Sequence, residues 1–348
     1  MNRSTSNKIS FPIAIAIIIA VLIALVMANL LIGSVDIAPR AVWQIITGQG
    51  HENAVWEIII LNTRVPMIVT AALSGAALSV AGLLLQTAFN NPLAGPSILG
   101  VSTGASFGVA VVMLASGSAV WLTQSVGSYM TILIGALAGA ALVLIVLLIF
   151  STMVHSSTML LIIGILVSYL ASSAVSLLNF FATEEGVHSY VIWGLGNFSG
   201  ITPSQLPFFA FFIIVALAAS TTLVKPLNAL LLGTRYAENL GVNTKQTRNA
   251  LLIITGILTA GVTAFCGPIS FIGLVVPHIA RLLLNTSNHN RLIPATMITG
   301  AAVALLCTLI SVLPKQYGVI PINAITPIIG VPIIIYIIVN RKNIQYFN

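Results

Sequence analysis

Residues 64–106 read RVPMIVTAALSGAALSVAGLLLQTAFNNPLAGPSILGVSTGAS and join two apolar segments through a polar turn. The first segment, 65–88, exceeds the ~20 residues that a helix needs to cross the hydrocarbon core of a membrane. The Asn-Asn-Pro run at 90–92 predicts its end, because asparagine tolerates turn geometry and proline cannot continue a helical hydrogen-bond ladder. The Pro-Ser pair at 96–97 predicts the first turn of a second helix, where a missing N–H group does no harm.

Small residues follow one face of the first segment, where Ala71, Gly75, Ser79 and Gly82 lie at spacings of four, four and three. Such a face lets a neighbouring helix approach closely, which favours a packing role. The alternative is that both segments and their turn belong to a substrate path, where polar backbone is tolerated at membrane depth.

The whole chain has the composition of an integral membrane protein. Of its 348 residues 58% are hydrophobic and 5% charged, with a mean hydropathy of +1.09, whereas a soluble domain has about 25% charged residues. We expect an all-α polytopic fold and a single permease domain over 1–348, because ten crossings leave no room for a sizeable soluble domain. The expected spans are 11–32, 65–88, 97–116, 128–150, 158–181, 206–224, 249–266, 269–284, 292–313 and 322–339. The first is expected to be retained, because its apolar run exceeds that of a signal peptide.

Loop charges predict the orientation in the membrane. Ten crossings put both termini on one side, and if that side is the cytoplasm it carries ten of the thirteen Lys and Arg residues. Five of the six acidic residues fall on the other side. We therefore expect a multi-pass protein of the cytoplasmic (inner) membrane with both termini cytoplasmic. We attribute the positive net charge to this topology. The chain has no dense basic patch with interleaved aromatic residues, the pattern that would suggest nucleic-acid binding.

Sequence signatures of catalysis are missing from the chain. It has no phosphate-binding loop, no H-E-x-x-H motif and no nucleophile elbow, so we expect no catalytic residues and no energy source of its own. The two cysteines, Cys266 and Cys307, fall in apolar segments and predict packing rather than a disulfide or a metal site. No carboxylate lies in the middle of a span, which disfavours a proton-coupled carrier. Sodium coupling stays open, because backbone carbonyls can bind that ion.

Residues 64–106 closely resemble the signature of the FecCD-type permeases, the membrane subunits of type II ABC importers for iron–siderophore complexes, haem and cobalamin. Two further blocks agree: 231–248 (LLGTRYAENLGVNTKQTR) resembles the cytoplasmic loop that contacts the ATPase, and 267–283 ends in the family's P-H-x-x-R. The resemblance covers nearly the whole chain and implies the type II importer permease fold with ten helices. Positions that match the first signature are Arg64, Pro66, Gly75, Gly82, Gln86, Asn91, Pro92, Leu93, Ala94, Pro96, Leu99, Gly100, Gly104 and Ala105.

The loop 225–248 carries the densest charge cluster of the chain. Charge alone suggests a solvated, positive-inside loop, whereas the resemblance implies a coupling helix seated in a groove on the nucleotide-binding subunit. We expect Ala237 and Leu240 to make its apolar contacts, with Arg235 and Glu238 at the polar rim. The predicted ATPase-coupling residues are Gly233, Arg235, Ala237, Glu238, Leu240, Gly241 and Val242.

The resemblance also implies a substrate route between two copies of the chain, lined by the fifth and tenth helices and the loop before the fifth. Small and apolar side chains suit a bulky chelate that has to slide without being held tightly. The predicted path and gate residues are Gln86, Asn90, Asn91, Pro92, Ser156, Ser157 and Thr158. At the P-H-x-x-R block, His278 and Arg281 are expected to pack and cap, with Arg281 bonding the last carbonyls of its own helix.

On the outer side the family docks a substrate-binding protein through charge pairs. The second arginine of its R-x-P-R motif is Met67 here, and the family's later Asp, Arg, Glu and Gly are replaced. This departure puts the usual docking charges in doubt. The replacing residues are Cys307, Ser311, Val319 and Asn323. The predicted docking residues are Arg64, Arg40 and Lys315, and Lys315 is equally well explained as an ordinary loop lysine.

These expectations combine into a permease subunit that forms a homodimer and pairs with two ATP-binding-cassette subunits and an extracytoplasmic substrate-binding protein. The chain itself is expected to bind no cofactor or metal, with ATP and Mg on the partner ATPase. The family favours an iron–siderophore cargo, with haem or cobalamin as alternatives. A stand-alone secondary transporter is the rival from another class, and a structural membrane scaffold is a third reading.

Overall fold

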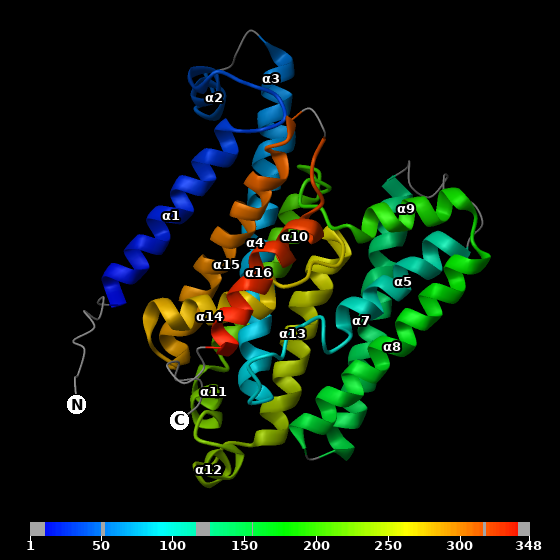
Figure 1. The fold of residues 1–348 in the computed structure, drawn as a ribbon, viewed down its shortest axis with the longest axis vertical. Helices are drawn as coiled ribbons and strands as arrows, with labels where there is room; N and C mark the ends of the chain where they lie inside the picture. The colour runs from blue at the N-terminus through cyan, green and yellow to red at the C-terminus, as the bar shows by residue number, and fades with distance from the viewer. Residues whose placement is uncertain (1–10, 50–52, 116–125, 155, 316–317, 340–348) are drawn as a thin grey trace.

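The computed structural model describes residues 11–49, 53–115, 126–154, 156–315 and 318–339, and within these ranges the chain forms helices joined by turns (Figure 1). In chain order they are α1 (Phe11–Leu31), α2 (Pro39–Ile46), α3 (Ala54–Ile59), the π-helical turn η1 (Ile60–Arg64), α4 (Val65–Ala88), α5 (Val101–Ala115), α7 (Val126–Met153), α8 (Ser157–Phe181), α9 (Glu184–Gly194), α10 (Leu206–Thr221), α11 (Val224–Leu230), α12 (Thr234–Asn239), α13 (Thr244–Cys266), α14 (Ile272–Leu284), α15 (His289–Val312) and α16 (Ile322–Val339).

The predicted all-α membrane fold is confirmed. In the described residues, six helices are long and apolar enough to span a bilayer, and α10 with α11 forms a seventh candidate that bends by 52°. Three shorter apolar helices, over Val101–Leu114, Ile272–Leu284 and Ile322–Ile337, match the remaining expected segments. Each of the ten segments expected from the sequence therefore corresponds to a helix.

The start of α5 differs from the expectation. The Pro-Ser pair at 96–97 lies in a turn, and α5 begins only at Val101. The reason is Gly100, which has a φ of +82° and so takes a left-handed conformation that a continuous right-handed helix does not allow. The irregular stretch between α4 and α5 is therefore longer than the sequence pattern predicts.

The central helix is α4, which is buried by α10, α13, α14 and α15 (Figure 1). A Cβ atom at Gly75 would lie 2.2 Å from the carbonyl oxygen of Gly300 on α15. At Gly82 it would lie 1.6 Å from that of Gly273 on α14. The small-residue face of α4 is therefore a packing surface, and its glycines let three helix backbones touch.

A second group of helices consists of α5, α7 and α8, drawn on the right of Figure 1. Gly104 and Gly108 on α5 face Gly139 and Gly135 on α7 in the same close manner, with a Cβ at Gly108 only 1.9 Å from the Gly135 oxygen. Helix α13 joins this group to α4 because it packs against both α4 and α7. Helices α2 and α3 lie at one end of the molecule and α11 and α12 at the other (Figure 1).

Candidate functional site

The segment expected to couple to an ATPase contains a short, well-defined helix at one end of the molecule, α12 (Figure 1). Gly233 before it and Gly241 after it have φ values of +99° and +82°, which glycine adopts without steric cost. The Gly241 N–H donates to Glu238 O at 2.9 Å and the Val242 N–H to Ala237 O at 3.0 Å. These two bonds form a Schellman motif, so backbone geometry terminates α12 sharply.

The exposed apolar face of α12 differs from the expected one. Ala237 is fully buried within this chain, whereas Leu240 is 58% exposed and Tyr236 is 53% exposed. The prediction that Ala237 contacts a partner is therefore wrong, because its side chain points into the protein. The outward apolar pair is Tyr236 and Leu240, four residues apart on one helical face. Sequence reasoning missed Tyr236, although this spacing identifies it.

The charged residues of α12 have different surroundings. Arg235 is exposed, as expected of a rim residue. Glu238 is also exposed, but its Oε1 accepts a hydrogen bond from Thr244 Oγ1 at 2.8 Å. Because Thr244 is the first residue of α13, this bond ties the end of α12 to a long helix of the core.

A cavity of about 270 Å³ is lined by residues of α12 and by the ends of the long helices α4, α7 and α13. Its charged lining residues are Glu238, Lys245 and Arg248. The Arg248 guanidinium donates to the carbonyl oxygen of Ser151, which joins the first turns of α13 to the end of α7. The complete lining is Ala88, Thr152, Val154, Leu230, Thr234, Glu238, Thr244, Lys245, Arg248 and Leu251.

The predicted stop after α4 is confirmed. Asn90 has a φ of +46°, its N–H donates to Thr87 O at 3.2 Å, and the Asn91 N–H donates to Gln86 O at 3.1 Å. This is again a Schellman motif, here with asparagine in the left-handed position. The Asn91 side chain accepts from Leu93 N at 2.9 Å, which closes an Asx turn.

Gln86 does not line an open path in this chain, which corrects the expectation. It is fully buried, its Oε1 accepts from Arg281 Nη1 at 2.6 Å and its Nε2 donates to Leu274 O at 3.1 Å. Both partners belong to α14, so Gln86 joins that helix to α4. Arg281 thus reaches another helix, a contact that the expectation of carbonyl capping did not include.

The turn after α4 is held by the same helix. His278 Nε2 lies 2.7 Å from Pro92 O, and because a carbonyl only accepts, the ring nitrogen is the donor. The P-H-x-x-R block and the N-P-L-A block, nearly 200 residues apart, therefore meet in one buried polar cluster. Histidine and arginine serve packing and hydrogen bonding here, as expected of them.

The predicted inner gate lies at the start of α8. Ser156 accepts a hydrogen bond from Met159 N at 3.4 Å and is the N-cap of this helix. Ser156 and Thr158 are exposed, and Ser157 is the first residue of the helix. Their backbone position is compatible with a gate at the mouth of a path, and the gating role stays a prediction.

Arg64 was expected to dock a binding protein, but its side chain is buried within this chain. It is 3% exposed, and its Nη1 donates to Leu30 O at 2.6 Å and to Leu31 O at 3.3 Å. Its Nη2 donates to Val35 O. The last carbonyls of a helix have no partner within that helix, so Arg64 caps α1 and holds the following turn. The docking role predicted for Arg64 is corrected to this structural one.

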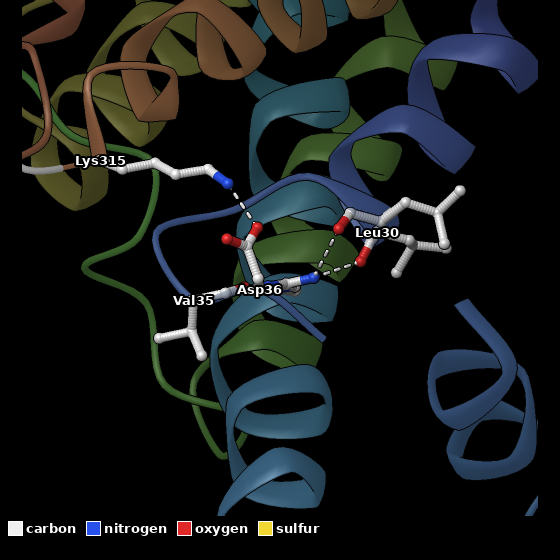
Figure 2. Close-up of polar contacts among 6 residues, drawn as sticks. Leu30, Val35, Asp36 and Lys315 are labelled. Atoms are coloured by element: carbon white, nitrogen blue, oxygen red, sulfur yellow. Dashed lines mark hydrogen bonds and ion pairs between the residues drawn. The ribbon is translucent and has the colours of Figure 1, made fainter. Parts of the chain in front are cut away.

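The other two docking candidates remain on the surface. Lys315 forms an ion pair with Asp36, and Figure 2 shows the Lys315 side chain extending toward the Asp36 carboxylate. An ion pair as exposed as this one contributes little to stability. The Lys315–Asp36 ion pair links the loop after α1 to the turn after α15. The third docking candidate, Arg40 on α2, is exposed.

Two of the four residues that depart from the family's outer pattern, Asn323 and Ser311, make internal hydrogen bonds. The Asn323 Oδ1 accepts from Ser270 N at 3.1 Å, and its Nδ2 donates to Gly194 O at 3.1 Å and to Pro268 O. Asn323 thereby joins α9, the α13–α14 connection and α16. Ser311 donates to Ile320 O in the same region. Ser311, at the position of the family's arginine, therefore makes a neutral hydrogen bond within this chain.

Comparison with known proteins agrees with this architecture. A profile of the FecCD transport family matches residues 21–340. The chain is 32% identical to the vitamin B12 import system permease protein BtuC of Photorhabdus laumondii over 304 residues, which cover 84% of this chain and 88% of the relative. It is 33% identical to the molybdate import system permease protein MolB of Haemophilus influenzae over 309 residues, covering 88% and 89%. It is 29% identical to the hemin transport system permease protein HmuU of Yersinia pestis over 312 residues, covering 89% and 90%.

A solved structure supports the same conclusion. An inward-facing conformation of a metal-chelate type ABC transporter superposes with a TM-score of 0.80 at 29% identity, covering 93% of this chain and 97% of the other. Family membership implies an ATPase partner and a binding protein. The profile match, the relatives and the shared fold establish that the chain belongs to the FecCD transport family, the membrane permeases of ABC importers.

Proposed function

We propose that the chain is the membrane subunit of an ATP-driven importer for a bulky metal chelate, with an iron–siderophore complex as the favoured cargo. It works as a homodimer with two ATPase subunits and an extracytoplasmic binding protein. The observation that carries this proposal is α12, a capped helix that presents Tyr236 and Leu240 to the outside. An exposed aromatic side chain such as Tyr236 is a typical anchor of a protein interface, and Leu240 extends its apolar surface.

The mechanism we propose is mechanical. ATP closes the ATPase dimer, the dimer displaces α12, and α12 passes the displacement to α11 and α13. The membrane helices then change the side to which the central path opens, which is a biased two-state movement. The chain makes and breaks no covalent bond, and ATP and Mg stay on the partner. Both termini lie in the cytoplasm, on the side of α12.

The faces of α8 and α16 support the homodimer and the kind of cargo. Both helices lack Asp, Glu, Lys and Arg throughout. On α8, Tyr169, Leu170 and Phe180 are exposed, and on α16 Ile328 and Tyr336 are exposed. An uncharged, partly aromatic path suits a large organic chelate, and it offers no cation to a small oxyanion such as the molybdate that the name of MolB records. Haem and cobalamin fit the same chemistry and are the alternatives.

Reconstitution tests the proposal directly. The chain is co-purified with its ATPase, placed in proteoliposomes and supplied with a binding protein loaded with radiolabelled ferric siderophore. We expect uptake that requires ATP and all three proteins. Uptake driven by a proton or sodium gradient without the ATPase would overturn the proposal. Competition by haem, cobalamin or molybdate then assigns the cargo class.

A further inference from the structure

A second buried polar cluster joins the cytoplasmic segment to the central helix. His289, the first residue of α15, is fully buried. Its backbone N–H and its Nδ1 each lie 2.9 Å from Oδ1 of Asn228 on α11. Its Nε2 lies 2.9 Å from Oγ1 of Thr87, near the end of α4. Asn228, His289 and Thr87 are called the relay residues below.

The network itself assigns the hydrogen positions of the relay. A backbone N–H can only donate, so the Asn228 atom that faces His289 is the carbonyl oxygen. The same oxygen faces Nδ1, which therefore carries the ring hydrogen in a neutral imidazole, and Nε2 accepts from the Thr87 hydroxyl. The amide end of Asn228 then donates to Asn288 Oδ1 at 3.2 Å. The Thr87 hydroxyl also lies 3.1 Å from Leu83 O in its own helix, so its single hydrogen is shared between that carbonyl and Nε2 of His289.

The relay fastens α11 to two long helices at once. Asn228 makes three hydrogen bonds to the first turn of α15, and His289 carries the connection on to α4. Helix α15 cannot slide freely along α4, because their backbones touch at Gly75 and Gly300. A displacement of α11 must therefore move α15 and α4 with it or leave buried polar groups unpaired, which is the more costly outcome.

We infer that the relay residues transmit the displacement of the coupling segment to α4 and α15. This inference rests on the proposed function, because the displacement originates in an ATPase. The relay acts as a positioning device: it touches neither cargo nor nucleotide. The transmitted displacement reaches the turn at residues 90–92, because that turn directly follows Thr87 and the end of α4.

The test removes the Thr87 hydroxyl, which contacts His289 and also Leu83 O in its own helix, and keeps the shape of the side chain. Thr87→Val replaces the hydroxyl by a methyl group of similar size, whereas Thr87→Ser keeps the hydroxyl. Thr308→Val is the matched control, because Thr308 is a buried hydroxyl whose bond goes to Ala304 O in its own helix α15, at 2.8 Å. Each variant is reconstituted with the ATPase and the binding protein, and cargo uptake and ATP hydrolysis are measured on the same vesicles.

We expect Thr87→Val to lower the cargo moved per ATP hydrolysed by about fivefold or more, the lower range of a coupling between two sites. ATP hydrolysis and ATPase binding stay near the wild-type level. Thr87→Ser and Thr308→Val keep the wild-type ratio. Asn228→Ala lowers the ratio too, and the double variant is no worse than the poorer single one, because both changes break the same connection.

A wild-type ratio in folded Thr87→Val overturns the inference. A parallel loss of hydrolysis, uptake and melting temperature in all variants also overturns it, because this pattern indicates a purely structural network. Failure of the proposed function is recognised separately. In that case the wild-type chain itself binds no ATPase or shows no ATP-dependent uptake.

Discussion

Leu240 and Ala237 lie three positions apart in one short segment, yet they have opposite environments. Ala237 is closed off by its own chain and Leu240 faces outward. Since both are small or medium apolar residues, composition does not distinguish them. Gly233 and Gly241 decide which side of α12 faces the protein. Their positive φ angles set the direction in which the chain enters and leaves the helix.

This difference gives a prediction for two parallel substitutions. Leu240→Asp should lower ATP-dependent uptake by about tenfold or more while the protein stays folded, because an unpaired carboxylate would be desolvated at the ATPase contact. Ala237→Asp should instead destabilise the permease itself. Uptake assays and melting curves on both variants check this, and wild-type uptake by Leu240→Asp would contradict the assignment of α12.

Arg64 was predicted to lie on a docking surface, but it makes buried hydrogen bonds. Its position in the R-x-P motif suggests a docking charge, whereas its guanidinium spans the carbonyls of Leu30, Leu31 and Val35. These carbonyls belong to a segment about 30 residues earlier in the chain. The sequence contains no pattern that links the two, because the contact arises only when α1 packs beside α4.

We predict that Arg64→Met destabilises the permease by about 1–3 kcal/mol, because buried carbonyls at the end of α1 lose their donor. The melting temperature in detergent should fall, and affinity for the binding protein should change only as far as folding does. Arg40→Ala, an exposed change on α2, is the control and should leave the melting temperature unaltered. Equal stabilities of the two variants would refute the capping role.

At the scale of helices, each of the ten expected spans corresponds to a helix, and the helix ends follow local chemistry. Asn90 ends α4, Gly241 follows the end of α12 and Asn285 ends α14, each with a positive φ. These signals depend on near neighbours along the chain, which is why they can be read from sequence. The late start of α5 departs from the sequence pattern, because the Pro-Ser pair at 96–97 predicts a helix start that the left-handed Gly100 prevents.

Close helix packing gives a prediction at this scale. Gly82→Ala should prevent α4 and α14 from packing, because its Cβ would overlap the Gly273 carbonyl. We expect strongly reduced yield of folded protein and a lower melting temperature. Gly194→Ala is the matched control, since a Cβ there meets no atom within 4 Å. A normally folded Gly82→Ala protein would contradict the observed approach of the two helices.

At the scale of the whole molecule, the arrangement places α2 and α3 opposite α11 and α12 (Figure 1). The charge bias of the loops predicts that the α12 end faces the cytoplasm. Helices α1, α4 and α15 join the two ends through shared polar contacts, with Arg64 at one end and His289 at the other. Packed helices thus connect α12 continuously to the end of the molecule that carries α2 and α3.

Orientation is testable with a membrane-impermeant maleimide. Lys245→Cys should be labelled only from the cytoplasmic side and Arg40→Cys only from the outside, since both positions are exposed. The native Cys266 and Cys307 are buried and should give little background. Labelling of Lys245→Cys in intact cells would place the coupling segment on the wrong side and overturn the proposed topology.

Hydropathy and local motifs are sufficient to predict the membrane class, the positions of the ten apolar segments, the turn after α4 and the family resemblance. These depend on hydropathy over about 20 residues or on motifs of adjacent residues. Tertiary structure decided the burial of Ala237 and Arg64, the bonds of Gln86 to α14 and the relay through His289. Thr87 and His289 are 202 positions apart, and only the packing of α4 against α15 brings their polar atoms within hydrogen-bond distance.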